Sequence, residues 1–248
     1  MPELPEAERA RQQIERVLGR EIAAVDDADT YVCRPHEPGE IAAALTGHTL
    51  VAAHRRGKFL WVETADGPTL GLHLGMAGRI VVDEPPAPRH WDRFALEFAG
   101  GGRLALHDRR RLGRAVLQPD HSHIGPDAGE VSRAAFRARV GRGTAPVKAR
   151  LLDQGTIAGV GNLLADEVLW RAGLSPLRPA GELTEAELDE LRRTLRASIR
   201  SAIRKGGVHT GGFIGHRRRD GECPRCGAAL ERATVGGRTT YWCPAEQR

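Results

Sequence analysis

The 248-residue sequence contains no apolar run that approaches the roughly 18 residues a helix needs to cross a bilayer. Charged residues stand at the N-terminus where a secretory signal peptide needs an apolar core, so we expect no membrane partner and a cytoplasmic location. Cysteine is also scarce, with four residues, three of which lie at position 223 or later. This crowding favours a metal site over a framework of disulfide bonds.

Charge is unevenly distributed along the chain. The net charge is only +5, but arginines gather in residues 109–114, 192–204 and 217–219, whereas acids dominate residues 182–190. Clustered arginine indicates a polyanionic partner, most simply nucleic acid, although solvated helix faces also carry such runs. Hydrophobic residues make up 40% of the sequence, which suffices for the core of one large domain or two ordinary ones.

The first six residues, M-P-E-L-P-E, contain a candidate nucleophile. Removal of Met1 would make Pro2 the free N-terminus, a secondary amine with a pKa near 8 that is partly neutral at pH 7. Glu3 beside it and Glu6 one turn later could serve as general acid or base. A proline near a chain start is also a common helix-entry residue, so the pattern alone leaves both interpretations open.

The periodicity of apolar residues predicts an α+β protein. A helix is expected over residues 5–18, followed by eight short alternating segments that suggest an N-terminal antiparallel β-sandwich with flanking helices, one of them at 38–45. Beyond residue 119 the pattern becomes helical, over residues 147–154, 162–172 and 184–205, and T-E-A-E at Thr184 is a capping box. We expect domain boundaries at 1–120, 121–214 and 215–248.

Three turns in the first half carry candidate binding residues. R-R-G-K ends at Lys58 between two strands, where a charged hairpin turn is the simpler interpretation. In H-L-G-M-A-G-R two glycines flank Met76 and would hold it on a tight turn, and in H-D-R-R-R-L-G three arginines surround Leu112. An exposed apolar side chain of this kind can wedge between stacked bases, but methionine is more often a core residue.

A glycine-rich turn, residues 155–162, leads into a helix at Asn162. Such a turn presents free N–H groups to an anion, here a DNA phosphate, while Asn162 could simply cap the helix.

The C-terminal segment resembles a zinc ribbon that lacks one ligand. C-P-R-C supplies Cys223 and Cys226, sixteen residues follow, and then comes Cys243. Glu246 stands where a fourth cysteine would be expected, and three thiolates with one carboxylate bind zinc less strongly than four thiolates. A β-hairpin that keeps the same shape by packing alone is the alternative. In both cases Arg238 lies near the expected hairpin tip.

Taken in order, these motifs resemble the formamidopyrimidine-DNA glycosylase and endonuclease VIII family over essentially the whole chain. The resemblance rests on P-E-L-P-E, R-R-G-K, H-L-G-M-A-G-R, D-R-R-R-L-G, L-L-D-Q-G-T-I-A-G-V-G-N-L-L-A-D-E and the terminal finger. It implies a β-sandwich, a helix-two-turn-helix domain and a zinc-finger-like C-terminal ribbon, with damaged DNA as the partner and no organic cofactor.

The resemblance also implies roles for single residues. Pro2 would attack C1′ of a damaged nucleotide and form a Schiff base, Glu3 would move protons, and Glu6 would support the N-terminus. Lys58 would act with these catalytic residues and also bind a phosphate. The other residues that would bind DNA or fill the void left by a flipped base are Met76, Arg110, Leu112, Lys148, Asn162 and Arg238. Base removal by this route requires extrusion of the nucleotide from the duplex.

One departure from the family bears on the lesion. Residues 206–213 run almost directly into the finger, whereas members that excise 8-oxoguanine usually carry a longer loop there. We therefore expect a base-excision-repair glycosylase with abasic-site lyase activity that favours oxidised pyrimidines, formamidopyrimidines or single-stranded lesions, acting as a monomer near the nucleoid. The alternatives are a binder of damaged or abasic DNA that does not cut, and an RNA-associated ribbon protein, which would leave Pro2 and Glu3 unexplained.

Overall fold

The computed structural model describes residues 2–83 and 90–248, and these form two compact units. The first unit comprises Pro2 and residues 7–122, and the second comprises residues 3–6 and 123–248. The helix α1, Leu4–Glu15, therefore contributes its first turn to the second unit and its remainder to the first. The finger groups with the helical unit, so the expected three-part division stays a prediction.

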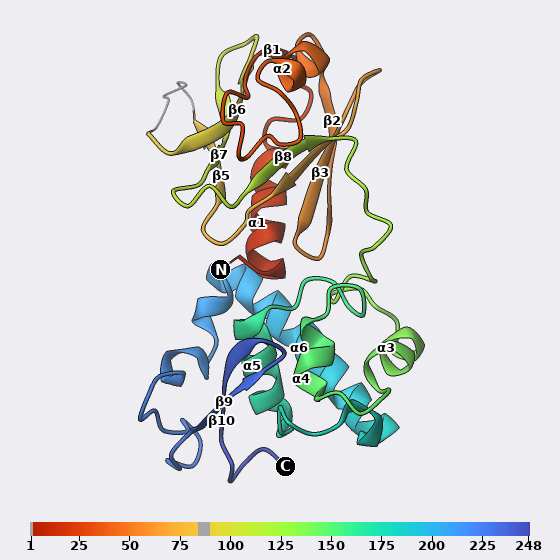
Figure 1. Cartoon of the computed structure of the whole chain (residues 1–248), viewed down its shortest axis with the longest axis vertical. Helices are drawn as coiled ribbons and strands as arrows, with labels where there is room; N and C mark the ends of the chain where they lie inside the picture. The colour runs from red at the N-terminus through yellow and green to blue at the C-terminus, as the bar shows by residue number, and fades with distance from the viewer. Residues whose placement is uncertain (1, 84–89) are drawn as a thin grey trace. The chain divides into compact units, whose positions relative to one another are not determined.

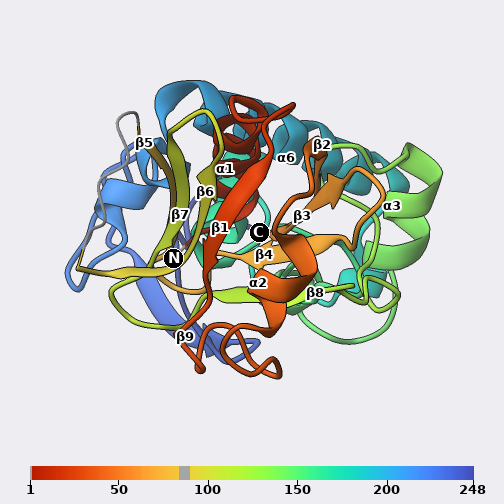
Figure 2. The ribbon, with the colours of Figure 1, turned by 90° about the horizontal axis from the view of Figure 1, so that it is seen from above.

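The first unit is a β-sandwich of two antiparallel four-stranded sheets, ordered β1-β6-β7-β5 and β2-β3-β4-β8, which Figure 2 shows side by side. The strands are β1 (Ile22–Asp26), β2 (Leu50–Arg56), β3 (Phe59–Thr64), β4 (Leu70–His73), β5 (Arg79–Asp83), β6 (Asp92–Phe98), β7 (Arg103–His107) and β8 (Arg114–Leu117), and α2 covers Glu40–Leu45.

Alternation along the strands builds the sandwich core. In β3, Leu60 and Val62 are buried while Trp61 and Glu63 between them are not, which is the period-two pattern of a half-buried strand. Ala10 and other apolar residues of α1 belong to the same core. The helix ends at Glu15 rather than at the expected residue 18, because the N–H groups of residues 16–18 donate to carbonyls three residues back in a tighter turn, after which Gly19 adopts φ +80°.

The second unit is helical (Figure 1). Its helices are α3 (Arg133–Val140), α4 (Val147–Leu152), α5 (Asn162–Ala172) and α6 (Glu185–Lys205), with short 3₁₀ turns η1 (Ala180–Glu182), η2 (Val208–Thr210) and η3 (Ile214–His216). Seven consecutive residues of α5, from Leu164 to Trp170, are buried, so α5 is the helix around which the unit is built. The predicted capping box at Thr184 is confirmed: its side chain accepts from the Glu187 N–H, and Glu187 bonds back.

The C-terminal hairpin consists of β9 (Glu231–Val235) and β10 (Arg238–Trp242), paired in antiparallel register. A small apolar cluster of Trp170, Phe213, Cys223 and Cys243 holds the finger against α5. Among the described residues, no helix combines the length and the apolar composition that crossing a membrane would require.

Candidate active site

The carboxylate of Glu3 is fully buried at the N-terminus of α5. Its Oε2 accepts hydrogen bonds from the N–H groups of Gly161 and Leu164, both at 3.0 Å, and its Oε1 accepts from Leu163 at 2.8 Å. Three backbone donors and the positive end of a helix dipole stabilise a negative charge at this point.

A glycine makes this placement of Glu3 possible. A Cβ atom at Gly161 would lie 2.2 Å from Cδ and 2.5 Å from Oε1 of Glu3, far inside van der Waals contact. Gly161 itself has φ −118° and ψ −169°, an extended backbone that any residue can adopt. Glycine is therefore required here for space and not for backbone conformation.

Glu6 fixes the backbone on which Glu3 is mounted. Its Oε2 accepts from the Glu3 N–H at 3.0 Å, and its Oε1 accepts from the Val208 N–H at 2.7 Å. The first turn of α1 is thereby capped by its own side chain and tied to η2. Pro2 is half-buried and directly precedes Glu3 in the chain. The bond from Glu6 to the Glu3 N–H therefore also holds the peptide group that joins Pro2 to Glu3.

The glycine-rich turn before α5 holds an anion, but not the expected one. The N-cap of α5 is Gly161, and Asn162 is the first helical residue without a capping side-chain bond, so the capping interpretation of Asn162 is wrong. The N–H groups that we expected to meet a DNA phosphate donate to Glu3 instead. An internal carboxylate thus takes the site that helix geometry offers to an external anion.

The side chain of Asn162 links α5 to the finger. Its Nδ2 donates to the Thr239 carbonyl at 3.0 Å, and its Oδ1 accepts from Lys148 Nζ at 2.7 Å. Lys148 is fully buried, and its ammonium also donates to Thr240 Oγ1 at 2.7 Å and pairs with Asp166 at 2.6 Å. The ammonium is therefore held by two hydrogen bonds and one ion pair inside the unit, and this enclosed position argues against direct contact with DNA.

Asp166, which sequence reasoning missed, is the charge that balances this buried lysine. Its second oxygen accepts from Arg217 Nε at 2.7 Å, so one carboxylate serves two cations. Burial lowers the pKa of Lys148, and the nearby Asp166 carboxylate partly offsets that effect. Asp166 stands four residues after Asn162, the spacing that places two side chains on one helix face, and this was the available signal.

Arg238 begins β10 at the hairpin turn, where its side chain is exposed. It follows Gly236 and Gly237, with φ +57° and +71°, which form the tight turn. Because Asn162 bonds to the neighbouring Thr239, the hairpin end that carries Arg238 is fixed relative to α5.

In the first unit, Lys58 lies in the β2–β3 turn and is half-buried. His73 at the end of β4 lies close to it: burial lowers the pKa of His73, and the positive charge of Lys58 lowers it further. His73 stands in the motif H-L-G-M-A-G-R, from which no role was predicted for it. Its position as the last residue of a strand before a glycine turn was the signal that it borders the loop of Met76.

The turn that carries Met76 packs against the loop that carries Leu112. A Cβ at Gly75, which has φ +59°, would lie 2.4 Å from the Leu112 carbonyl group, so the two backbones touch. Met76 is 39% exposed and Leu112 is half-buried, whereas a core residue would be enclosed. The structure thus brings together two of the predicted wedge residues, and Arg110 is exposed on the same loop as Leu112.

Asp108 organises this loop and was not singled out from the sequence. It is fully buried, and it accepts from the N–H groups of Arg110 at 2.9 Å and of Leu112 and Gly113, both at 2.7 Å. An aspartate that bonds the backbone two residues on is a recognised turn signal, and here it could have been found in D-R-R-R-L-G.

The three finger cysteines form a candidate metal centre. The Sγ atoms of Cys223, Cys226 and Cys243 lie within 4.8 Å of one another, and Cys226 and Cys243 are 3.6 Å apart. Tetrahedral zinc with Zn–S bonds of about 2.3 Å separates its sulfur ligands by about 3.8 Å, so these residues fit the ion. Hydrogen bonds from Trp170 and backbone N–H groups outweigh burial and lower the pKa of Cys223, whereas burial raises the pKa of Cys243.

Glu246 does not belong to this cluster within the described residues. Its carboxylate pairs with Arg225 at 3.8 Å, and the Arg225 guanidinium stacks over Trp170 at 4.0 Å. The neighbouring Gln247 is buried. It accepts from the Cys243 N–H at 2.9 Å and donates to the Leu174 carbonyl at 2.8 Å, so it links the finger to the segment that follows α5. The expected fourth ligand is therefore not shown.

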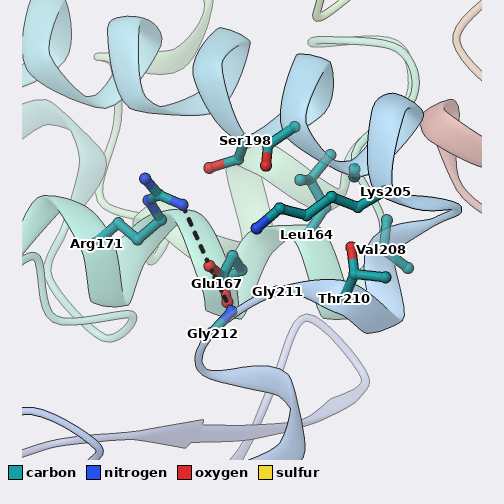
Figure 3. Close-up of a pocket in the computed structure, with 11 residues that line it drawn as sticks. Leu164, Glu167, Arg171, Ser198, Lys205, Val208, Thr210, Gly211 and Gly212 are labelled. Carbon is teal, nitrogen blue, oxygen red and sulfur yellow. Dashed lines mark hydrogen bonds and ion pairs between the residues drawn. The ribbon is translucent and has the colours of Figure 1, made fainter.

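The connection from α6 to the finger is short and held by two carboxylates. Glu6 binds the Val208 N–H, and Glu167 of α5 accepts from Gly212 at 3.1 Å and Phe213 at 2.8 Å. Figure 3 shows Glu167 between Gly212 and Arg171 at the edge of a cavity of about 50 Å³, large enough for a few water molecules.

Comparison with known proteins gives three matches along the chain. Residues 1–115 match the N-terminal domain of formamidopyrimidine-DNA glycosylase, residues 124–212 match its H2TH domain, and residues 221–245 match the zinc finger found in FPG and IleRS. Only eight residues therefore separate the H2TH and finger matches.

Whole proteins are similar over their full length. The formamidopyrimidine-DNA glycosylase of Nocardioides sp. is 41% identical, over 100% of this chain and 94% of its own. Lactococcus lactis Fpg, solved with DNA that contains an abasic site, is 29% identical with a TM-score of 0.87 over 99% of both chains. The same enzyme solved with DNA that contains an oxidised pyrimidine is 30% identical, with a TM-score of 0.87 over 100% of both.

Proposed function

This chain belongs to the formamidopyrimidine-DNA glycosylase family, and we propose that it is a base-excision-repair DNA glycosylase with abasic-site lyase activity. The observation that carries the proposal is the carboxylate of Glu3, which is held by three N–H groups of α5 next in sequence to Pro2. Burying a carboxylate costs free energy even when three N–H groups bind it, so stability does not explain its presence. A buried carboxylate beside a nucleophile can transfer protons.

In the proposed reaction the Pro2 nitrogen forms a bond to C1′ of the damaged nucleotide. The bond from C1′ to the base breaks, and the base leaves with the electron pair and gains a proton. The Pro2 nitrogen then gives up its proton, and the bond from C1′ to O4′ breaks as O4′ gains a proton, which leaves an iminium, the Schiff base. Loss of a C2′ proton then breaks the C3′–O bond and expels the 3′ phosphate with the electron pair. Glu3 moves protons in these steps, and Glu6 keeps the Glu3 backbone in place.

Contacts with DNA phosphates and with the gap left by the flipped nucleotide are proposed for single residues. Lys58, Asn162 and Arg238 are proposed to hold the phosphates around the flipped nucleotide, with Met76, Arg110 and Leu112 filling the gap that it leaves. We assign Lys148 to positioning, because its buried ammonium fixes the amide of Asn162. Unstacking one base costs a few kcal/mol, which the inserted side chains partly offset.

The short connection supports a preference for lesions other than 8-oxoguanine. With η2 tied to Glu6 and Gly212 tied to Glu167, residues 208–212 have little freedom to close over a flipped purine. We expect oxidised pyrimidines and formamidopyrimidines to be excised at least about tenfold faster than 8-oxoguanine, a difference of ~1.4 kcal/mol in activation free energy. Single-turnover rates on otherwise identical duplexes test this; equal rates would contradict it.

Zinc is proposed to be held by the thiolates of Cys223, Cys226 and Cys243, with water or Glu246 as the fourth ligand. Its role would be structural. Metal analysis of the purified protein should give one zinc per chain, and a folded protein without metal would show that the hairpin keeps its shape by packing. We further propose a monomer that acts in the cytoplasm on the nucleoid.

The amine chemistry is tested by reduction with borohydride on abasic DNA, followed by mass spectrometry of the N-terminal peptide. A mass increase located on Pro2 is expected. Tight binding of abasic DNA without any reduced adduct would favour the alternative function, a binder of damaged DNA that does not cut.

A further inference from the structure

The cavity of about 50 Å³ in the second unit lies between two helices, α5 and α6, and the connection that follows α6. Each helix lines it with residues three or four apart, which is the spacing of side chains on one helix face. These residues are Leu164, Glu167 and Arg171 on α5, and Ser198, Ser201, Ala202 and Lys205 on α6. We refer to this space as the α5–α6 cavity.

Small side chains on α6 leave the α5–α6 cavity open. A seam between two packed helices is normally filled by apolar side chains at close-packed density. Here α6 contributes Ser198, Ser201 and Ala202, whose side chains are too short to fill the seam. The space that remains is polar on the α6 side and holds a few water molecules or one small oxyanion.

The hydroxyl group of Ser198 is the first sign of a ligand. Ser198 is 4% exposed, and its Oγ has no hydrogen-bond partner within residues 2–83 and 90–248. A serine inside a helix usually turns its hydroxyl to solvent or to the carbonyl four residues back. A buried hydroxyl that does neither costs free energy, and a polar molecule in the cavity removes that cost.

Two cations and one carboxylate border the same space. Figure 3 shows the side chains of Arg171 and Lys205 directed into the cavity from opposite sides. Arg171 lies 3.6 Å from Glu167, which is longer than a hydrogen bond, and Lys205 has no hydrogen bond or ion pair in the part of the chain that the structure describes. One carboxylate thus leaves a net positive charge, which an anion between the two cations would neutralise.

The groups around the cavity also indicate which anion fits. Lys205, Arg171 and Ser198 offer hydrogen-bond donors from different directions, and a tetrahedral oxyanion has acceptor oxygens to match. Glu167 can only accept, so an oxyanion beside it needs a proton to donate. Inorganic phosphate keeps such a proton at pH 7, whereas sulfate has none, and a phosphate monoester with its second pKa near 6 has lost most of its own.

We propose that the α5–α6 cavity binds inorganic phosphate. Lys205, Arg171 and Ser198 donate to its oxygens, and its hydroxyl group donates to Glu167. None of the residues that line the cavity is among the proposed catalytic or DNA-binding residues, so the inference does not rest on the proposed function. Because the ion joins α5 to α6, phosphate should also raise the melting temperature of the protein.

Calorimetric titration of the purified full chain with inorganic phosphate, at constant ionic strength, tests the site. Lys205→Ala should raise the Kd at least about tenfold, a difference of ~1.4 kcal/mol in binding free energy. Ser198→Ala should also weaken binding, but it should not lower the melting temperature of the phosphate-free protein, because the hydroxyl that it removes has no partner there. Arg204→Ala is the matched control: Arg204 is an exposed cation next to Lys205 that does not line the cavity, and its loss should leave the Kd unchanged.

Sulfate and thymidine 5′-monophosphate test the choice of ligand. Wild type should bind inorganic phosphate at least about tenfold more tightly than either of them. In Glu167→Gln, whose amide group can donate, sulfate should bind as tightly as phosphate.

Two results would overturn the proposal. If wild type binds sulfate or the nucleotide as tightly as phosphate, Glu167 does not select a protonated oxyanion and the ligand is wrong. If phosphate does not bind, or binds equally well to Lys205→Ala, the cavity holds water only and the site is wrong.

Discussion

Substitution of Gly161 by alanine tests the placement of Glu3 without removing any functional group. The added methyl group would lie 2.2–2.5 Å from Glu3, and since the backbone at Gly161 is extended, no conformational strain accompanies it. The carboxylate must move or the neighbouring chain must yield.

The size of the effect follows from the contacts that are lost. A hydrogen bond to a charged group contributes about 1.5–3 kcal/mol, and overpacking a site costs about 1–3 kcal/mol. Since the three bonds to Glu3 will not all break, we expect the free energy of unfolding to fall by about 2–4 kcal/mol. A shift of about 1 Å in a catalytic group can lower a rate by about 10²-fold, and we expect a loss of this order in abasic-site cleavage.

The assay is single-turnover cleavage of abasic DNA, with thermal unfolding and DNA affinity measured on the same samples. Gly215→Ala is the control, because a Cβ there meets nothing within 4 Å. In a Glu3→Gln background, Gly161→Ala should lower the rate little further, since both changes act on one group. A folded Gly161→Ala protein that cleaves within about twofold of the wild-type rate would refute the reasoning.

Three further results are expected. Asp108→Ala leaves three N–H groups of the loop that carries Leu112 without their acceptor, so cleavage of duplex lesions should fall while that of single-stranded lesions is unchanged; an equal fall on both would contradict this. Lys148→Met leaves Asp166 buried without this partner and should lower the unfolding free energy by about 3–5 kcal/mol, whereas Lys148→Met with Asp166→Leu should recover part of it in chemical denaturation. Because the pKa of His73 is lowered in the folded protein, its imidazole binds a proton more readily in the unfolded chain. The free energy of unfolding should therefore fall as the pH drops below about 6.5 and level off below the folded-state pKa. In His73→Phe this part of the pH dependence of the melting temperature should vanish.

Local signals in the sequence predicted most of the elements. The strand-forming alternation and the capping box at Thr184 act over a few residues, so they can be read without knowing the fold. The candidate nucleophile region and the three cysteines were found for the same reason, because their members stand close together in the chain.

Long-range contacts could not be predicted in this way. Glu3 and Gly161 are 158 residues apart, and nothing near Gly161 indicates that its helix receives an internal carboxylate rather than a phosphate. The same holds for Lys148, whose partner Thr240 lies 92 residues away: its burial depends on the hairpin packing against α5. Tyr31 and Arg114 are 83 residues apart, and their contact likewise depends on the fold and not on a local signal.

Borohydride trapping on an oligonucleotide with one abasic site is the most direct test of whether Pro2 is a nucleophile for which Glu3 transfers protons. Wild type, Pro2→Gly and Glu3→Gln should be compared at matched DNA occupancy. We expect a strong covalent product with wild type, severe loss with Pro2→Gly, and slowed formation with Glu3→Gln at unchanged affinity. A correctly processed wild-type protein that binds the DNA but gives no covalent product would contradict it.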